Sequence, residues 1–192
     1  MAKKSDELEE LRKELERADA KREELIAKSR ELIKQSKTAI YALQRGDDKT
    51  AATVLAGMKN EVRLLEPFLK DTVFAGVIKP AIQEYIEAAC FREFVLTGNM
   101  LPRKELGVSA EHYLAGLCDL SGEIVRKAIN AAINDDSKTV VRAKKFVEEL
   151  YYGLLQFDLR NGELRRKFDG LKYDLKKMED LLLSLKLQGK VK

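Results

Sequence analysis

Residues 83–91, Gln-Glu-Tyr-Ile-Glu-Ala-Ala-Cys-Phe, place two glutamates three positions apart in a largely apolar run. Residues 113–123, Tyr-Leu-Ala-Gly-Leu-Cys-Asp-Leu-Ser-Gly-Glu, place an aspartate and a glutamate four positions apart in a similar setting. Side chains three or four positions apart lie on one face of an α-helix. The two runs therefore predict two helices, each with a pair of carboxylates among apolar residues.

The four carboxylates of these runs are candidates for a metal site. Carboxylates on apolar helices lose hydration and repel one another, so they need a compensating cation. Mg²⁺ prefers oxygen ligands and can prepare a water for attack on a phosphate ester, and Mn²⁺ is an alternative. The two acidic faces meet if the helices are antiparallel neighbours. The candidate catalytic and metal-binding residues are Glu84, Glu87, Asp119 and Glu123.

The rest of the chain predicts an all-α fold of six or seven helices in a single domain over residues 1–192. Residues 5–43 contain no glycine or proline, and their apolar residues recur in steps of three and four. This pattern predicts one long helix with a coiled-coil-like seam, interrupted by Arg22, Ser29 and Ser36. The seam predicts packing against a helix of the same domain or of a neighbouring subunit.

Caps and helix breakers predict where the other helices begin and end. The predicted elements are a helix over about 49–69, a helix with Pro80 in or near its first turn that ends at Gly98, a loop or single turn over 101–107, a helix capped by Ser109 that ends near Asn134, and helices over 138–155 and 162–187.

Composition indicates a soluble protein in a reducing cytoplasm. The chain has 192 residues, of which 45% are hydrophobic and 35% charged. It has no apolar run of about 18 residues, so we expect no membrane contact, and its N-terminus does not resemble a secretory signal. Its two cysteines, Cys90 and Cys118, lack metal-ligand spacing.

Basic residues beside the acidic pairs fit a polyanionic substrate, although a solvated helix flank is an equally good interpretation of each. Residues 160–192 carry ten Lys or Arg against five Asp or Glu, an excess that attracts phosphate. The candidate nucleic-acid-binding residues are Lys79, Arg92, Arg126, Lys127, Arg165, Arg166 and Lys167.

Several rival chemistries lack the residues they need. The chain has one histidine, His112, whereas a di-iron carboxylate bundle uses Glu-x-x-His pairs. A single histidine also makes a serine or cysteine catalytic triad a poor interpretation, and the sequence has no Gly-rich phosphate-binding loop. An all-α, Mg²⁺-dependent nucleotide pyrophosphohydrolase remains an alternative, as does a non-catalytic module that binds single-stranded RNA or DNA.

The same runs carry a resemblance to the translin family. Residues 83–91 and 113–123 resemble its two signature segments, and residues 164–177, Leu-Arg-Arg-Lys-Phe-Asp-Gly-Leu-Lys-Tyr-Asp-Leu-Lys-Lys, are similar to its C-terminal helix. In that family translin binds single-stranded nucleic acid, while translin-associated factor X supplies catalytic carboxylates to a complex that cleaves RNA with Mg²⁺. The resemblance implies a compact archaeal or prokaryotic homologue with a translin-like bundle.

The expected function follows from the carboxylates together with this resemblance. We expect a metal-dependent endoribonuclease that cleaves single-stranded or flexible RNA. One of the four carboxylates could double as general base, with Glu123 as the first candidate, and the sequence alone does not assign this role. The resemblance implies a homo-oligomer, a closed octamer with its acidic sites facing an inner cavity. Two departures concern RNA binding: the family's basic segment is not matched around residues 74–80, and its first basic cluster is reduced to Lys59 and Arg63. His112 also stands where the family usually has an acidic residue.

Overall fold

The computed structural model describes residues 2–191, with side chains from residue 6 onward, and this part of the chain contains helices and no strands. The all-α prediction is confirmed. The helices are α1 (Ala2–Gln44), α2 (Asp48–Leu65), the 3₁₀ helix η1 (Glu66–Lys70), α3 (Ala75–Thr97), the single-turn α4 (Arg103–Leu106), α5 (Ala110–Ile133), α6 (Ser137–Leu154) and α7 (Glu163–Leu187).

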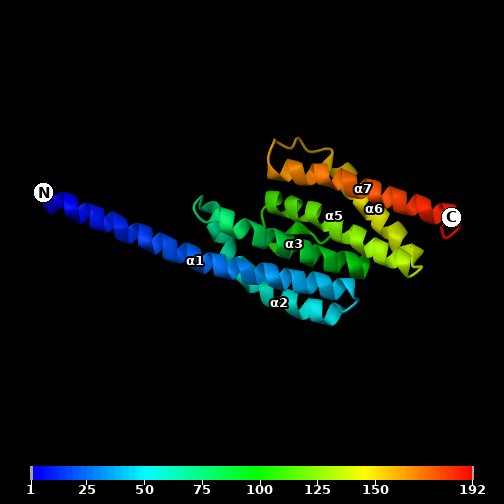
Figure 1. The fold of residues 1–192 in the computed structure, drawn as a ribbon, viewed down its shortest axis with the longest axis horizontal. Helices are drawn as coiled ribbons and strands as arrows, with labels where there is room; N and C mark the ends of the chain where they lie inside the picture. The colour runs from blue at the N-terminus through cyan, green and yellow to red at the C-terminus, as the bar shows by residue number, and fades with distance from the viewer. Residues whose placement is uncertain (1, 192) are drawn as a thin grey trace.

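Four of the helices pack in the order α1, α3, α5, α7, as Figure 1 shows. α2 covers α1 and α3 on one side, and α6 covers α5 and α7 on the other. The buried apolar residues form one core, with Phe91 and Phe94 of α3 and Leu117 and Leu120 of α5 fully buried within it. α3 and α5, which carry the two acidic runs, therefore lie in the middle of the bundle. Within residues 2–191, we find no helix that combines the length and apolar character needed to cross a bilayer.

α3 and α5 run parallel, not antiparallel as the sequence suggested, because residues 98–109 return along the bundle before α5 begins (Figure 1). Lys79 near the start of α3 accordingly lies beside Glu111 near the start of α5, and the acidic runs still meet.

The long N-terminal helix packs on the body of the protein only over its second half. Leu25, Leu32 and Leu43 of the seam are buried, whereas Leu8, Leu11 and Leu15 are 68%, 50% and 67% exposed. Figure 1 shows the first half of α1 extending well beyond the other helices. The predicted seam is thus used within the chain at one end and presents leucines to solvent at the other.

α3 begins earlier than the sequence predicts. Pro80 was expected in or near the first turn, but it is the sixth residue of the helix, which starts at Ala75. The start is set by the preceding turn, in which the Asp71 carbonyl accepts a hydrogen bond from the Ala75 N–H at 2.8 Å. No side chain caps this end. Pro80 lacks the N–H that would bond one turn back, and its exposed position keeps that loss small.

α5 begins as predicted and lies close to α3 at a glycine. The Ser109 hydroxyl accepts a hydrogen bond from the His112 N–H at 3.3 Å, which confirms Ser109 as the N-cap. At Gly116 a Cβ atom would lie 2.6 Å from Cγ2 of Ile86 and 3.1 Å from the Gln83 carbonyl oxygen. Only glycine allows this approach, which brings the acidic run of α5 next to that of α3.

Candidate functional site

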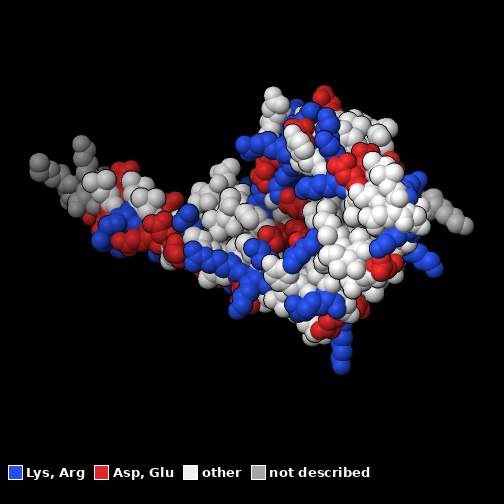
Figure 2. Space-filling model, turned by 45° about the vertical axis from the view of Figure 1, so that its right-hand side comes forward, with Lys and Arg blue, Asp and Glu red and all other residues white. Residues whose placement is uncertain are grey.

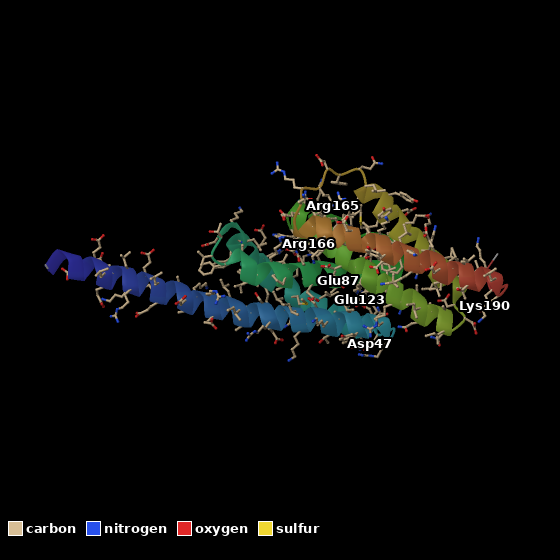
Figure 3. All side chains as sticks on the ribbon, turned by 45° about the horizontal axis from the view of Figure 1, so that its top comes forward. Asp47, Glu87, Glu123, Arg165, Arg166 and Lys190 are labelled. Atoms are coloured by element: carbon tan, nitrogen blue, oxygen red, sulfur yellow. The ribbon has the colours of Figure 1, made fainter. Side chains whose placement is uncertain are left out.

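The two acidic runs meet where α3 packs on α5, and all four predicted carboxylates lie there, each partly buried. Glu84 and Glu87 come from α3, and Asp119 and Glu123 come from α5. Figure 3 places Glu87 and Glu123 next to each other on neighbouring helices. Figure 2 shows acidic side chains in a hollow in the middle of one face, with Lys and Arg on either side. We call these four residues the carboxylate group.

The members of the carboxylate group are close enough to shift one another's protonation. Burial, and then the charges of Glu84, Asp119 and Glu123, raise the pKa of Glu87 to about 8. Burial also raises the pKa of Glu84, against the opposing charge of Lys37. A negative charge on Glu87 is therefore costly in this poorly hydrated place, and at neutral pH the metal-free site keeps a proton on that side chain.

Two members of the group are engaged by side chains from other helices. The Lys167 ammonium of α7 forms an ion pair with Oδ2 of Asp119, whose pKa is nevertheless raised, because burial outweighs this contact. The Gln44 amide at the end of α1 donates to Oε2 of Glu123 at 2.8 Å and to the Glu123 carbonyl oxygen at 3.0 Å. The arrangement thus joins four helices at one site.

The chemistry of the donor set fits Mg²⁺ or Mn²⁺, because carboxylate oxygens are the ligands that hard divalent cations prefer. In the part of the chain that the structure describes, however, no three His, Cys, Asp or Glu side chains converge closely enough to hold one ion. Like charges repel, and Asp119 and Glu123 are turned toward Lys167 and Gln44. The ligands are gathered at one place without being assembled into a coordination sphere.

Outside the carboxylate group, three of the predicted nucleic-acid-binding residues join one helix to another. Lys79 lies 3.1 Å from Oε2 of Glu163 and 3.6 Å from Oε1 of Glu111, which ties α3 to the starts of α7 and α5. Lys127 donates hydrogen bonds to the Leu43 and Gln44 carbonyl oxygens at 2.9 and 3.3 Å. These carbonyl groups at the end of α1 have no partner within the helix, so Lys127 caps it.

Arg92, the third, contacts Asp48 through two hydrogen bonds of 2.6 and 3.0 Å, which link α3 to the first turn of α2. Replacing Arg92 with methionine should lower the free energy of unfolding by about 1 kcal/mol, because both charge-assisted bonds are lost from a partly exposed pair. Urea unfolding measures the change, with the exposed Lys59→Met as control. An equal effect of the two substitutions would contradict the structural role. Titration with labelled RNA tests the separate prediction that Arg92 contacts nucleic acid.

The other predicted basic residues border the carboxylate group or the start of α7. Arg126 lies 3.8 Å from Oε2 of Glu123, and its guanidinium stacks over the Tyr41 ring. Arg165 pairs with Asp169 at 3.0 Å, and Arg166 is exposed (Figure 3). Lys167 contacts a member of the carboxylate group. Of the basic triplet Arg165, Arg166 and Lys167 at the start of α7, it is therefore the residue whose side chain points toward the site.

Gln44 and Lys37 belong to the site although no sequence pattern indicates them. Gln44 is 79 positions from Glu123, and it follows the last leucine of the seam with no motif of its own. The charge of Lys37 reaches Glu84 only because α1 packs on α3. No sequence signal could have found either residue, since each contact depends on how the helices are arranged.

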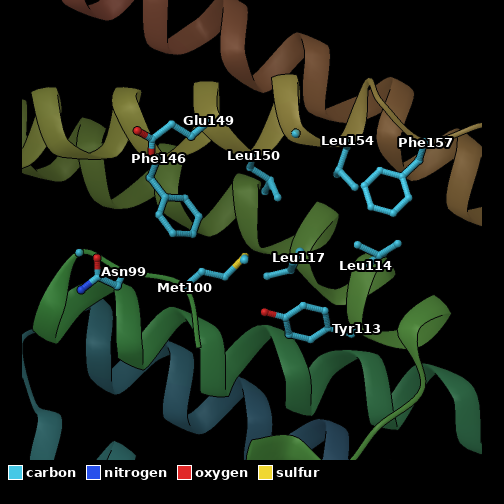
Figure 4. Close-up of a pocket in the computed structure, with 12 residues that line it drawn as sticks. Asn99, Met100, Tyr113, Leu114, Leu117, Phe146, Glu149, Leu150, Leu154 and Phe157 are labelled. Atoms are coloured by element: carbon cyan, nitrogen blue, oxygen red, sulfur yellow. The ribbon is translucent and has the colours of Figure 1, made fainter. Parts of the chain in front are cut away.

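A separate cavity of about 440 Å³ lies between the end of α3, the start of α5 and α6. Figure 4 shows its apolar lining, in which Phe146, Leu150 and Leu154 face Met100 and Leu117. Such a lining suits an apolar group and offers little to a phosphate. The carboxylate group therefore remains the candidate site for phosphate chemistry.

The fold and site define an all-α protein with an oxygen-donor site between two central helices. The chain belongs to the translin family, whose profile matches residues 20–189. It is 31% identical to translin of Gallus gallus over 122 residues, which are 56% of this chain and 53% of that protein. It is 25% identical to translin-associated protein X of Rattus norvegicus over 150 residues, 60% of this chain and 51% of that one.

An archaeal relative and two solved structures extend the similarity. An uncharacterized protein of Methanocaldococcus jannaschii is 31% identical over 134 residues, 68% of this chain and 60% of that protein. The crystal structure of apo-NeC3PO superposes with a TM-score of 0.84 at 30% identity, covering 92% of this chain and 95% of that one. A structure of AfC3PO with duplex RNA superposes with a TM-score of 0.78 at 25% identity, covering 95% and 97%.

These comparisons confirm the prediction of a translin-family protein of archaeal or prokaryotic type. The aligned stretch spans only about half the length of the two vertebrate relatives. Their activities therefore enter below as proposals for this chain.

Proposed function

We propose that this protein is a metal-dependent endoribonuclease that cleaves single-stranded or flexible RNA. The observation that carries the proposal is the carboxylate group on α3 and α5, which gathers four partly buried carboxylates at one place. Burial, and then the charges of the other three, raise the pKa of Glu87 to about 8. Such an excess of buried negative charge is costly for folding, and it is typical of a site that binds a cation. The similarity to AfC3PO, a structure of which contains duplex RNA, supports a nucleic-acid substrate.

The residues have distinct roles in this proposal. Glu84, Glu87, Asp119 and Glu123 would hold Mg²⁺ or Mn²⁺, and a bound divalent cation supplies an activated water and a positive charge for the phosphate. Glu123 would take the proton from that water, and Gln44 fixes the orientation of its carboxylate through the 2.8 Å hydrogen bond. Arg126, 3.8 Å from Glu123, is placed to attract an RNA phosphate to the same position.

We also propose a homo-oligomer, for which the family resemblance implies eight chains around a cavity. The exposed Leu8, Leu11 and Leu15 on one face of α1 support assembly, because a row of exposed leucines is unfavourable in water. A site that faces an inner cavity would restrict the substrate to short or threadable RNA.

A cleavage assay tests the catalytic proposal. Wild type should cut a labelled single-stranded RNA in Mg²⁺, EDTA should abolish cleavage, and Glu123→Gln should slow it by about 10²-fold or more because the general base is lost. Glu179→Gln makes the same change at an exposed position of α7 and serves as the control. Circular dichroism checks that each variant is folded.

Each of the following results would contradict the proposal. Cleavage that persists in EDTA, or that Glu123→Gln leaves unchanged, would exclude the carboxylate group as the source of activity. Intact RNA in every lane, with Mn²⁺ also tried and RNA binding still measurable, would favour the non-catalytic binding module. Hydrolysis of free nucleoside triphosphates with intact RNA would favour the pyrophosphohydrolase.

A further inference from the structure

Lys167 is the member of its basic triplet that enters the carboxylate group. It lies on α7, one turn after Glu163, and its ammonium contacts Oδ2 of Asp119 on α5, 48 positions away. Its side chain is 22% exposed, whereas the Arg165 side chain is 46% exposed and pairs with Asp169 on α7 itself. The position of Lys167 is therefore a property of the fold, since α5 packs on α7 at this point.

The positive charge of Lys167 offsets part of the repulsion among the carboxylates of the site. Four partly buried carboxylates repel one another, and one ammonium in contact with Asp119 offsets part of that repulsion. The same ammonium opposes the binding of a divalent cation at the same carboxylate, because two positive charges a few ångströms apart repel each other. Lys167 and a metal ion therefore compete for one ligand.

The structure also provides a second acceptor for the Lys167 ammonium. Oε1 of Glu163, one turn earlier on α7, lies 4.0 Å from Nζ of Lys167. A lysine has four flexible methylene groups, so it can exchange between two carboxylates with little change in the backbone. Glu163 is also 3.1 Å from Lys79, which leaves one carboxylate shared by two amines.

We propose that Lys167 is a built-in counterion that occupies Asp119 in the metal-free protein and must leave it before a divalent cation can bind there. On release, its ammonium moves toward Glu163 or toward a substrate phosphate, so metal binding and substrate attraction are linked through one side chain. This inference rests on the proposed function, since it concerns the same carboxylate group. It explains why the ligands are gathered without converging on a common point.

The test is the affinity for Mn²⁺, measured by titration calorimetry or by the electron paramagnetic resonance of the free ion. Lys167→Met removes the charge and keeps a side chain of similar length, so it should bind Mn²⁺ about tenfold more tightly than wild type, or better. Lys167→Arg retains the charge and should bind no more tightly than wild type. Lys172→Met, an exposed position on the same helix, controls for the general loss of positive charge and should change the affinity less than twofold.

Thermal unfolding without metal gives a second measurement. Lys167→Met should melt at a lower temperature than wild type in EDTA, and Mn²⁺ should raise its melting temperature by more than it raises that of wild type. A smaller rise would count against competition. Circular dichroism confirms that the variants are folded before either measurement is interpreted.

The outcomes separate this inference from the proposed function. If wild type binds Mn²⁺ and Lys167→Met binds it equally or more weakly, Lys167 does not compete with the metal, while the metal site itself stands. If only Lys167→Met binds Mn²⁺, the competition is stronger than expected and the inference holds. If neither protein binds Mn²⁺ at millimolar concentration, both the inference and the metal-dependent function are overturned.

Discussion

Replacing Glu87 with glutamine is expected to raise the free energy of unfolding at pH 9 by about 2–4 kcal/mol, although it removes a candidate metal ligand. Burial and the charges of Glu84, Asp119 and Glu123 raise the pKa of Glu87 from 4.5 to about 8. Above that pH the folded protein must hold a charge that the unfolded chain carries freely in water. Glutamine has nearly the same shape and carries no charge, so the cost disappears.

The pH dependence of this effect has a definite sign. Below pH 4.5 Glu87 is protonated in both the folded and the unfolded protein, so the substitution should change stability little. Between pH 4.5 and about 8 the folded protein retains a proton that the unfolded chain loses, and wild type loses stability as the pH rises. The advantage of Glu87→Gln should therefore grow through this window and level off above pH 8.

Urea unfolding of both proteins from pH 4 to pH 9 measures the difference, in EDTA to exclude trace metal. The exposed Glu179→Gln variant should show no comparable trend.

The same substitution at Glu87 should also lower activity. Mg²⁺-dependent RNA cleavage by Glu87→Gln should fall by about 10²-fold or more, because a metal ligand is lost. A stability difference that does not vary with pH would contradict the burial of a shared negative charge. A variant that is more stable but less active than wild type is expected when functional residues reduce the stability of the folded protein.

Replacing Gly116 with alanine is expected to destabilise the protein by about 1–3 kcal/mol. The new methyl group would lie 2.6 Å from Cγ2 of Ile86 and 3.1 Å from the Gln83 carbonyl oxygen, and a carbonyl oxygen in a central helix cannot move aside cheaply. α3 and α5 would have to separate, which would draw Glu87 away from Asp119. Metal affinity should therefore fall together with stability.

Gly122, six residues along the same helix, provides the matched control. A Cβ there would meet only Oδ2 of Asp174, at 4.0 Å, and the position is exposed. Gly122→Ala should therefore stabilise the protein by up to about 1 kcal/mol through helix propensity. Thermal or urea unfolding of the two variants shows the difference, and shifts of the same sign would contradict the close approach at Gly116. Of these two glycines, Gly116 is the one at which the two helices approach closely.

Local patterns predicted the helices well because each pattern acts within a few residues. Ser109 caps α5, and Gly98, with φ of 78°, ends α3. The start of α3 was placed too late, since it depends on a main-chain hydrogen bond to Asp71 and on no capping side chain. The sequence predicts the long helix. It does not predict which half of the seam is buried, because that depends on the length of the helices packed beside it.

The carboxylate group was predictable in part for the same reason. Spacing placed Glu84 with Glu87 and Asp119 with Glu123, each pair on its own helix. That Lys167 would contact Asp119, and Gln44 would contact Glu123, could not be predicted from sequence, because these residues are 48 and 79 positions apart. The residues that bear the negative charge form a motif, whereas the residues that balance it come together only in the folded bundle.

The placement of the carboxylates on α3 and α5 has an evolutionary consequence. Ile82, Ile86 and Phe91 surround the acidic pair of α3 and are fully buried, so most substitutions in this run would disturb packing as well as chemistry. An enzyme whose ligands lie on loops can change specificity by altering those loops, but this site lacks that freedom. Under the proposed function, we expect selection for a new RNA preference to act on the rim of the site, at Lys37, Arg126 and residues 163–167, while the two acidic runs stay fixed.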